Sequence, residues 1–322
     1  MTGRFAPSPT GVLHLGNLRT AVAAWLWARS NGLEFVVRME DLDRVTSSPE
    51  HAEGQLRDLR RIGLDWDGPV VVQSERFERY HTAIARLADA GLTYPCFCSR
   101  RDIRDAAAAP HMTQPAPHMT QPAPHMTRPA PKAGDEAQRY PGTCRHLSAA
   151  EVSERMAVGR APAIRLRADH TPIEITDQFA GMHRGIPDDV VLRRGDGVPA
   201  YHLAVVIDDA DQGVTQVLRA DDLLSSTPSQ VLLQQLLGLP TPSWAHIPLV
   251  VSERGDRLAK RDGAVTLDDL AQQTRPRQPS EVTALLLSSL GQPLDSIERR
   301  GRGFQLGSIP PTPLVYRPSD WG

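Results

Sequence analysis

Residues 4–17 read RFAPSPTGVLHLGN, a turn rich in proline and glycine that leads directly into a helix. Apolar residues at helical spacing predict that helix over 18–30, with its end near Asn31 and Gly32. The segments 3–6 and 34–39 are predicted to be strands. A strand, a glycine-bearing turn, a helix and a second strand form a βαβ unit, so the sequence predicts an α/β fold with a parallel sheet.

The same stretch has the chemistry of a triphosphate site. His14 and Asn17 are three residues apart at the predicted helix start, where backbone N–H groups favour phosphate, and Gly16 permits close approach of a ligand. A distant loop, RLAKRD at 257–262, carries Lys260, one of only two lysines in the chain. A mobile ammonium suits the triphosphate from the other side. The alternatives are an ordinary capped turn and a lone surface lysine.

The other helices and strands are predicted from the spacing of apolar residues and from the glycine and proline residues that end each segment. We expect further helices at 49–62, 75–90, 228–237 and 281–290. We expect strands at 163–167, 171–176, 201–207 and 214–218, and a brief extended segment at 70–74. The run Tyr201–Ile207 is apolar enough for a buried parallel strand. The tail from Gln292 carries glycine and proline repeatedly and is expected to be poorly structured.

A proline-rich repeat lies between the predicted elements before residue 100 and those after residue 160. The heptad PHMTQPA occurs at 110–116 and 117–123, and PHMTRPA follows at 124–130. Two prolines in each heptad exclude a helix or a central strand, so we expect a low-complexity surface insertion. Its three histidines could form a metal tract, but a tandem duplication in a tolerant loop is the simpler interpretation.

Composition narrows the class of protein. The chain has 322 residues, a formal net charge of −2 and three cysteines, all between 96 and 144. A near-neutral chain argues against indiscriminate nucleic-acid binding, though one local basic face could hold one RNA. Three clustered cysteines are unlike a secreted disulfide framework, and no apolar run reaches 18 residues. We expect a cytoplasmic monomer without a membrane segment.

Together, the motifs at 4–17 and 257–262 resemble the HIGH and KMSKS signatures of class I aminoacyl-tRNA synthetases. The motifs RFAPSPTG at 4–11 and RMEDLD at 38–43 narrow the resemblance to the glutamyl branch. The resemblance covers residues 3 to about 270. Two departures stand out: Asn17 replaces the second histidine of HIGH, and the second loop keeps only Leu258-x-Lys260.

The resemblance implies a Rossmann-like doubly wound parallel sheet with a zinc-binding insertion and a short helical C-terminal part. The implied division is residues 1–95 as the first half of the catalytic domain, 96–160 as the insertion with the 110–130 repeat, 161–270 as the second half with the KMSKS-like loop, and 271–322 as a short helical segment and flexible tail.

The resemblance also implies the roles of individual residues. His14, Asn17 and Lys260 would be catalytic, and these three with Gly16 would bind ATP, supplied with Mg²⁺. Glutamate would be bound by Arg4, Phe5, Ala6, Pro7, Ser8, Glu40, Tyr201 and Arg219. Among these, Arg4 and Arg219 are candidate carboxylate forks, and Glu40 suits the substrate ammonium. Alone, each arginine would be assigned to the surface, Glu40 to a helix cap and Tyr201 to the core.

Cys96, Cys98 and Cys144 resemble a structural zinc site of this family, with one zinc per chain. In the family pattern Tyr140, in the segment YPGTC, supplies the fourth ligand. His146 is a chemically more ordinary alternative for zinc. Three reduced structural thiols without metal are the remaining interpretation.

Full glutamyl-tRNA synthetases continue into a helical anticodon-binding domain, for which this sequence has no counterpart. We therefore expect membership of the shorter glutamyl-Q branch. Its members form glutamyl-adenylate from ATP and transfer glutamate to queuosine at the wobble position of tRNA(Asp). Two alternatives stay open: a truncated or tRNA-independent glutamate-activating enzyme with another acceptor, and a non-catalytic tRNA-binding remnant.

Overall fold

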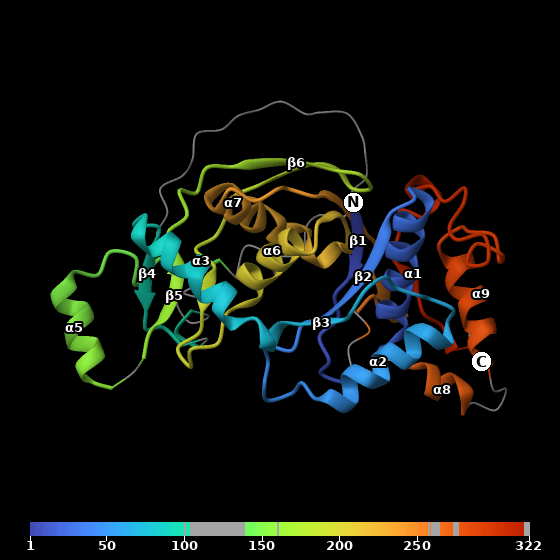
Figure 1. Ribbon diagram of the computed structural model, residues 1–322, viewed down its shortest axis with the longest axis horizontal. Coiled ribbons are helices and arrows are strands. Elements are labelled where there is room, and N and C mark those ends of the chain that lie inside the picture. The colour runs from blue at the N-terminus through green and yellow to red at the C-terminus, as the bar shows by residue number, and fades with distance from the viewer. Residues whose placement is uncertain are drawn as a thin grey trace.

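The chain folds around a mostly parallel sheet, seen in a computed structural model that describes residues 1–99, 101–103, 139–159, 161–256, 258, 265–272 and 277–318 (Figure 1). Within those residues the sheet has seven strands in the order β3-β2-β1-β9-β10-β6-β7. Their bounds are Val71–Val72, Glu34–Met39, Thr2–Phe5, Val214–Ala220, Ser243–Ile247, Ile173–Asp177 and Gly181–Gly185. All neighbours are parallel except the β6–β7 hairpin. The expected α/β class with a doubly wound parallel sheet is confirmed.

The helices pack on this sheet and at its ends. In the described residues they are α1 (Leu15–Ser30), α2 (Pro49–Arg61), α3 (Phe77–Asp89), α5 (Ala149–Ala157), α6 (Tyr201–Asp211), α7 (Thr227–Leu237), α8 (Leu267–Ala271) and α9 (Pro279–Ser289). Short 3₁₀ turns add η1 (Gln73–Glu75), η3 (Asp221–Ser226) and η5 (Leu306–Ser308). Helix α1 is buried along most of its length, and it covers β1 and β2 in Figure 1.

Local sequence explains why β1, α1 and β2 form the predicted unit. A capping box at His14 and Asn17 begins α1, three residues before the predicted start. Gly3 in β1 allows that helix to approach, because a Cβ there would lie 2.6 Å from the Cβ of Ala28. Helix α7 ends as predicted at Gly238, whose φ of 64° is in the left-handed region.

A smaller antiparallel sheet lies toward the end of the long axis opposite helix α9, on the left in Figure 1. It pairs β4 (Thr93–Cys96), β5 (Ala163–Leu166) and β8 (Val191–Arg193) in the order β4-β5-β8. Strands β4 and β8 were not predicted, nor were β7 and β10. Strand β4 brings Cys96 next to β5, so segments on both sides of the repeat meet here.

Two sequence-based expectations were wrong. Residues 201–207, expected as a strand, begin helix α6. Every residue from Leu203 to Asp209 is buried, so the apolar run has no amphipathic period and could not be distinguished from a buried strand.

The tail after Gln292, expected to be poorly structured, is ordered through residue 318. Its strand β12 (Leu314–Val315) pairs with β11 (Val250–Val251), and Phe304, Ile309 and Tyr316 are buried in the main core. Its order comes from contacts with residues distant in the sequence.

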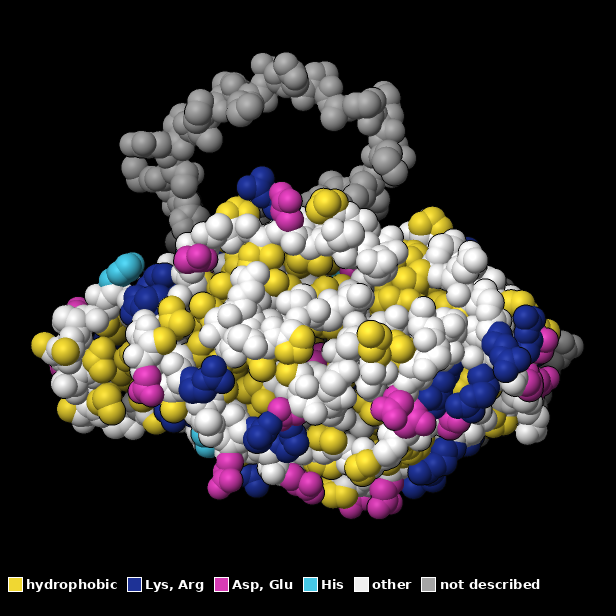
Figure 2. Space-filling model, turned by 45° about the horizontal axis from the view of Figure 1, so that its top comes forward, with side chains coloured by type: hydrophobic (Ala, Val, Ile, Leu, Met, Phe, Trp, Pro, Cys, Tyr) yellow, Lys and Arg dark blue, Asp and Glu magenta, His cyan; other side chains and the backbone are white. Residues whose placement is uncertain are grey.

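Some predictions fall outside the described residues, namely the 110–130 repeat and Lys260. Among the helices that the structure does describe, none is long and apolar enough to cross a membrane. On the face shown in Figure 2, basic and acidic side chains are intermixed, which agrees with the net charge of −2.

Candidate functional site

A cavity of about 500 Å³ opens where the chain order of the sheet reverses. Strands β1 and β9 are neighbours there, with β2 beyond one and β10 beyond the other. Ligands of open α/β sheets bind at such a point, outside the carboxyl ends of the strands. Of the residues predicted to bind glutamate or ATP, the walls contain all that the structure describes except Gly16: Arg4, Phe5, Ala6, Pro7, Ser8, His14, Asn17, Glu40, Tyr201 and Arg219.

The start of α1 forms one wall. The Nδ1 atom of His14 accepts a hydrogen bond from the N–H of Gly16 at 3.1 Å, and Asn17 Oδ1 accepts from the N–H of His14 at 3.3 Å. A Cβ at position 16 would lie 3.1 Å from the His14 ring, a tight contact, so glycine favours this arrangement. Gly16, His14 and Asn17 also line a small hollow that adjoins the cavity. The wall thus presents the positive end of the α1 dipole and an oriented imidazole.

Gln55, on α2, holds the turn that precedes α1 in place. The sequence analysis did not identify this residue. Its amide donates to the carbonyls of Ser8 and Gly11, at 3.0 and 2.7 Å. The side chain is buried and also lines the cavity. A glutamine in the polar helix 49–61 gave no signal of this role, because the contact spans more than 40 residues.

A buried charge network forms the floor around Glu40. Arg4 is paired with Asp209 through its Nε at 3.2 Å, and Arg38 is paired with the same carboxylate at 2.8 Å and with Glu40 at 3.2 Å. Burial raises the pKa of Glu40, although the neighbouring Arg38 and Arg4 favour its charged form. The cavity therefore contains both a guanidinium and a carboxylate in a dry environment, where charges interact strongly.

Arg219, at the end of β9, differs from Arg4 because its partners are neutral. It donates hydrogen bonds to His246 Nε2 (2.8 Å), Thr227 Oγ1 (2.9 Å), Gln230 Oε1 (3.0 Å), Tyr201 Oη (3.3 Å) and the carbonyl of Leu223 (3.3 Å). Among the described residues, no carboxylate lies within ion-pair distance of it. Burial lowers the pKa of Arg219. A buried cation of this kind is stabilised by an anionic ligand.

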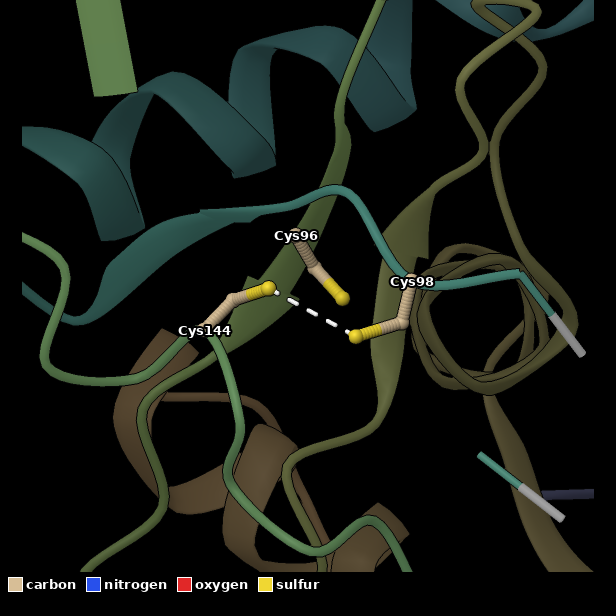
Figure 3. Close-up of side chains that lie close together, drawn as sticks. All are labelled: Cys96, Cys98 and Cys144. Atoms are coloured by element: carbon tan, nitrogen blue, oxygen red, sulfur yellow. Dashed lines mark hydrogen bonds between the residues drawn. The ribbon is translucent and has the colours of Figure 1, made fainter. Parts of the chain in front are cut away.

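The three cysteines form a separate cluster in the insertion. Cys96 and Cys98 come from the end of β4, and Cys144 comes from the far side of the repeat (Figure 3). Their sulfurs all lie within 4.8 Å of one another and point toward a common centre. All three are free thiols. Sulfurs at this spacing suit a soft or borderline divalent cation such as zinc.

The hydroxyl of Tyr140 joins this cluster and His146 does not. Tyr140 Oη lies 3.3 Å from Cys96 Sγ and 3.6 Å from Cys98 Sγ, and it accepts from the N–H of Cys144 at 2.8 Å. His146 is exposed and is not among the metal-ligating side chains that converge here. Burial raises the pKa of Cys98 to about 11 and also raises that of Tyr140. A bound cation would reverse this, because it stabilises the deprotonated ligands.

Comparison with known proteins places the chain in a family. Residues 1–298 match the catalytic domain of the class I tRNA synthetases (E and Q). The chain is 58% identical to a glutamyl-Q tRNA(Asp) synthetase of Nocardia farcinica, over 90% of this chain and 85% of that protein. It is 48% identical to a glutamyl-Q tRNA(Asp) synthetase of Cutibacterium acnes, over 97% of this chain and 82% of that protein.

Among solved structures, the fold resembles a glutamate tRNA ligase of Elizabethkingia meningosepticum that was determined in complex with its amino acid. The TM-score is 0.76 at 24% identity, over 99% of this chain and 67% of that one. This likeness supports the fold, and the sequence relatives support the family. The chain belongs to the glutamyl and glutaminyl group of class I tRNA synthetases, in the family of the glutamyl-Q tRNA(Asp) synthetases.

Proposed function

We propose that the protein activates L-glutamate with ATP to form glutamyl-adenylate, and transfers the glutamyl group to queuosine at the wobble position of tRNA(Asp). The observation that carries the amino-acid part is Arg219, a buried guanidinium on the cavity wall whose protein partners are all neutral. A substrate carboxylate supplies the missing anion. The family relationship supports the reaction, and the relatives' names support the acceptor.

The cavity residues divide glutamate's three charges between them. Arg219 and Tyr201 bind one carboxylate, with Arg4 as the second guanidinium on the wall. Glu40 binds the substrate ammonium, and Ser8 donates a hydrogen bond to the amino acid. Phe5, Ala6 and Pro7 line the same wall and shape it around the substrate. Each charged group is held by buried partners, so little reorganisation is needed when glutamate binds.

ATP is bound beside the start of α1. The positive end of the α1 dipole, the His14 ring and the Asn17 amide bind the phosphates, and Gly16 lets the nucleotide approach the backbone. The α-carboxylate oxygen of glutamate attacks the α-phosphorus, and pyrophosphate leaves. Lys260, which lies outside the described residues, stabilises the charge that develops. Mg²⁺ accompanies ATP and neutralises part of the triphosphate charge.

In the second step a hydroxyl of queuosine attacks the carbonyl carbon of the adenylate, an ester bond forms and AMP leaves. The near-neutral surface is consistent with a local contact to one stem-loop, as opposed to a broad nucleic-acid interface. We propose that the protein works in the cytoplasm as a monomer, with residues 1–95 and 161–270 forming the catalytic unit.

The cysteine cluster would hold one structural zinc, with Cys96, Cys98, Cys144 and Tyr140 as the four ligands. The donor set fits, because three sulfurs and one phenolic oxygen converge from two segments that the metal would hold together. Four protein ligands leave no open position for catalysis. Tyr140 is favoured over His146 because its hydroxyl already lies among the sulfurs.

Glutamate-dependent ATP–pyrophosphate exchange in the absence of tRNA tests the first step. We expect exchange with glutamate and little with glutamine or aspartate, because glutamine lacks the side-chain carboxylate and the side chain of aspartate is one methylene shorter. Arg219→Leu should abolish measurable exchange. Failure of the wild-type protein to exchange with glutamate under these conditions would reject adenylation.

A further inference from the structure

Three neighbouring strands end in a chain of buried side chains, of which the proposed function uses only Arg219. Asp177 ends β6, His246 is in β10 and Arg219 is in β9. His246 Nδ1 lies 2.6 Å from Asp177 Oδ2, and His246 Nε2 lies 2.8 Å from Arg219 Nε. The side chains of Asp177 and His246 have no exposed surface. A charged carboxylate is thus linked through one imidazole to the arginine on the cavity wall.

The hydrogen bonds of Arg219 differ between its buried side and its cavity side. Three buried contacts, to His246, Thr227 and Gln230, measure 2.8–3.0 Å, one for each guanidinium nitrogen. The other two contacts are longer, 3.3 Å each, and go to Tyr201 and Leu223, which line the cavity. The buried contacts therefore anchor the guanidinium, and a ligand carboxylate can replace the two long ones on the terminal nitrogens.

The tautomer of His246 follows from its neighbours. Arg219 Nε carries a hydrogen and can only donate, so His246 Nε2 must accept. The proton is then on Nδ1 and is donated to Asp177, whose Oδ1 accepts from the backbone N–H groups of His246, Phe179 and Ala180 at 3.1, 3.0 and 2.7 Å. Burial also lowers the pKa of His246, which agrees with a neutral ring. Asp177 thereby keeps the proton on Nδ1, so that the Nε2 atom facing Arg219 is unprotonated.

We infer that His246, held in one tautomer by Asp177, is a positioning residue that aims Arg219 at a carboxylate of the glutamate substrate. This inference rests on the proposed function, because it requires that Arg219 binds a carboxylate of glutamate. Neither Asp177 nor His246 lines the cavity. Their effect is expected in the affinity for glutamate, with little effect on the affinity for ATP or on the chemical step.

Asp177→Asn tests this sharply. The three backbone N–H groups keep the amide oxygen in the place of Oδ1, so the amide nitrogen faces His246 Nδ1 and donates to it. The ring must then carry its proton on Nε2, against the N–H of Arg219. Losing a hydrogen bond to a charged group predicts a rise in the KM for glutamate of about 10- to 100-fold. The KM for ATP and kcat should change less than about threefold.

Glu174→Gln is the matched control, because Glu174 is on the same strand β6 but is exposed, paired with Arg184 at 4.0 Å. It should leave all kinetic constants and the melting temperature unchanged. A KM for glutamate in Asp177→Asn within threefold of wild type would overturn the inference. Parallel rises in the KM for glutamate and for ATP would indicate a general structural defect and would also overturn it.

The tautomer can be measured without any activity. In ¹⁵N-histidine-labelled wild-type protein, the ring signals missing from His246→Gln identify His246. The inference requires a protonated Nδ1 and an unprotonated Nε2, and the reverse would overturn it even if Asp177→Asn does not fold. Absence of glutamate-dependent exchange in the wild type would instead reject the proposed function, so the two failures are distinguishable.

Discussion

Replacing Asp209 by asparagine should destabilise the protein and weaken glutamate binding together. Asp209 is 3% exposed and is the common anionic partner of Arg4 and Arg38, themselves 6% and 0% exposed. Removing one partner of a buried ion pair costs about 3–5 kcal/mol, since the remaining charge is left in a dry environment. For a chain of this length that corresponds to a fall in Tm of roughly 5–10 °C.

Asp211→Asn provides the control. Asp211 is on the same helix, two residues further, and it pairs with Arg76 and Arg79, but its side chain is 24% exposed. Pairs near the surface contribute little, so its Tm should change by less than about 2 °C. The KM for glutamate should rise only in Asp209→Asn, because only that change releases Arg4 at the cavity wall. Thermal melting and pyrophosphate exchange on both variants measure these effects, and equal melting shifts would refute the reasoning.

The ion pairs of Asp209 with Arg4 and Arg38 make the stability of the protein depend on pH. Burial alone raises the pKa of Asp209, but the guanidinium groups of Arg4 and Arg38 hold it below its usual range. The unfolded-state value is about 3.9, so this stabilisation is complete above about pH 4 and is lost as the pH falls through the lower folded value. The melting difference between wild type and Asp209→Asn should therefore shrink at low pH.

Three further predictions concern the other parts of the site. Cys98→Ser and Tyr140→Phe should each reduce the zinc content of protein purified without added metal, whereas His146→Ala should not; loss confined to the histidine variant would reverse the ligand assignment. Because burial raises the pKa of Glu40, the KM for glutamate should rise as the pH falls into the range where this carboxylate becomes protonated, and Glu40→Gln should remove that dependence; an unchanged pH profile in Glu40→Gln would argue against its role. Lys260→Ala should lower exchange about 100-fold or more, and equal exchange would remove this lysine from the mechanism.

The local parts of the fold could be predicted from the sequence. The unit from β1 to β2 was predicted correctly because its caps, its helical period and its glycine turn are all encoded within 40 residues. The end of α7 was predicted for the same reason, from Gly238. Elements that depend on distant partners were not: β12 is a strand because β11 lies beside it, and α6 is a helix buried on every side.

In the functional site, too, local features could be predicted and contacts between distant residues could not. The resemblance identified residues that line the cavity, because its motifs include them, whereas the residue types alone would have placed them on the surface, at a cap or in the core. It did not identify the residues that support them. Asp209 and His246 act through contacts that span 205 and 27 residues. One signal was available: two adjacent aspartates that follow an apolar run must be buried, and buried acids require cationic partners.

The central claim is that glutamate is transferred to the anticodon of tRNA(Asp), and locating the labelled glutamate tests it most directly. The protein is incubated with ATP, radiolabelled glutamate and tRNA(Asp) that carries or lacks queuosine, and nuclease mapping then identifies the labelled nucleotide. We predict label at the wobble nucleotide, only in the queuosine-containing tRNA. Label on the 3′-terminal adenosine, or equal charging of tRNA(Glu), would contradict the account and favour a truncated glutamyl-tRNA synthetase.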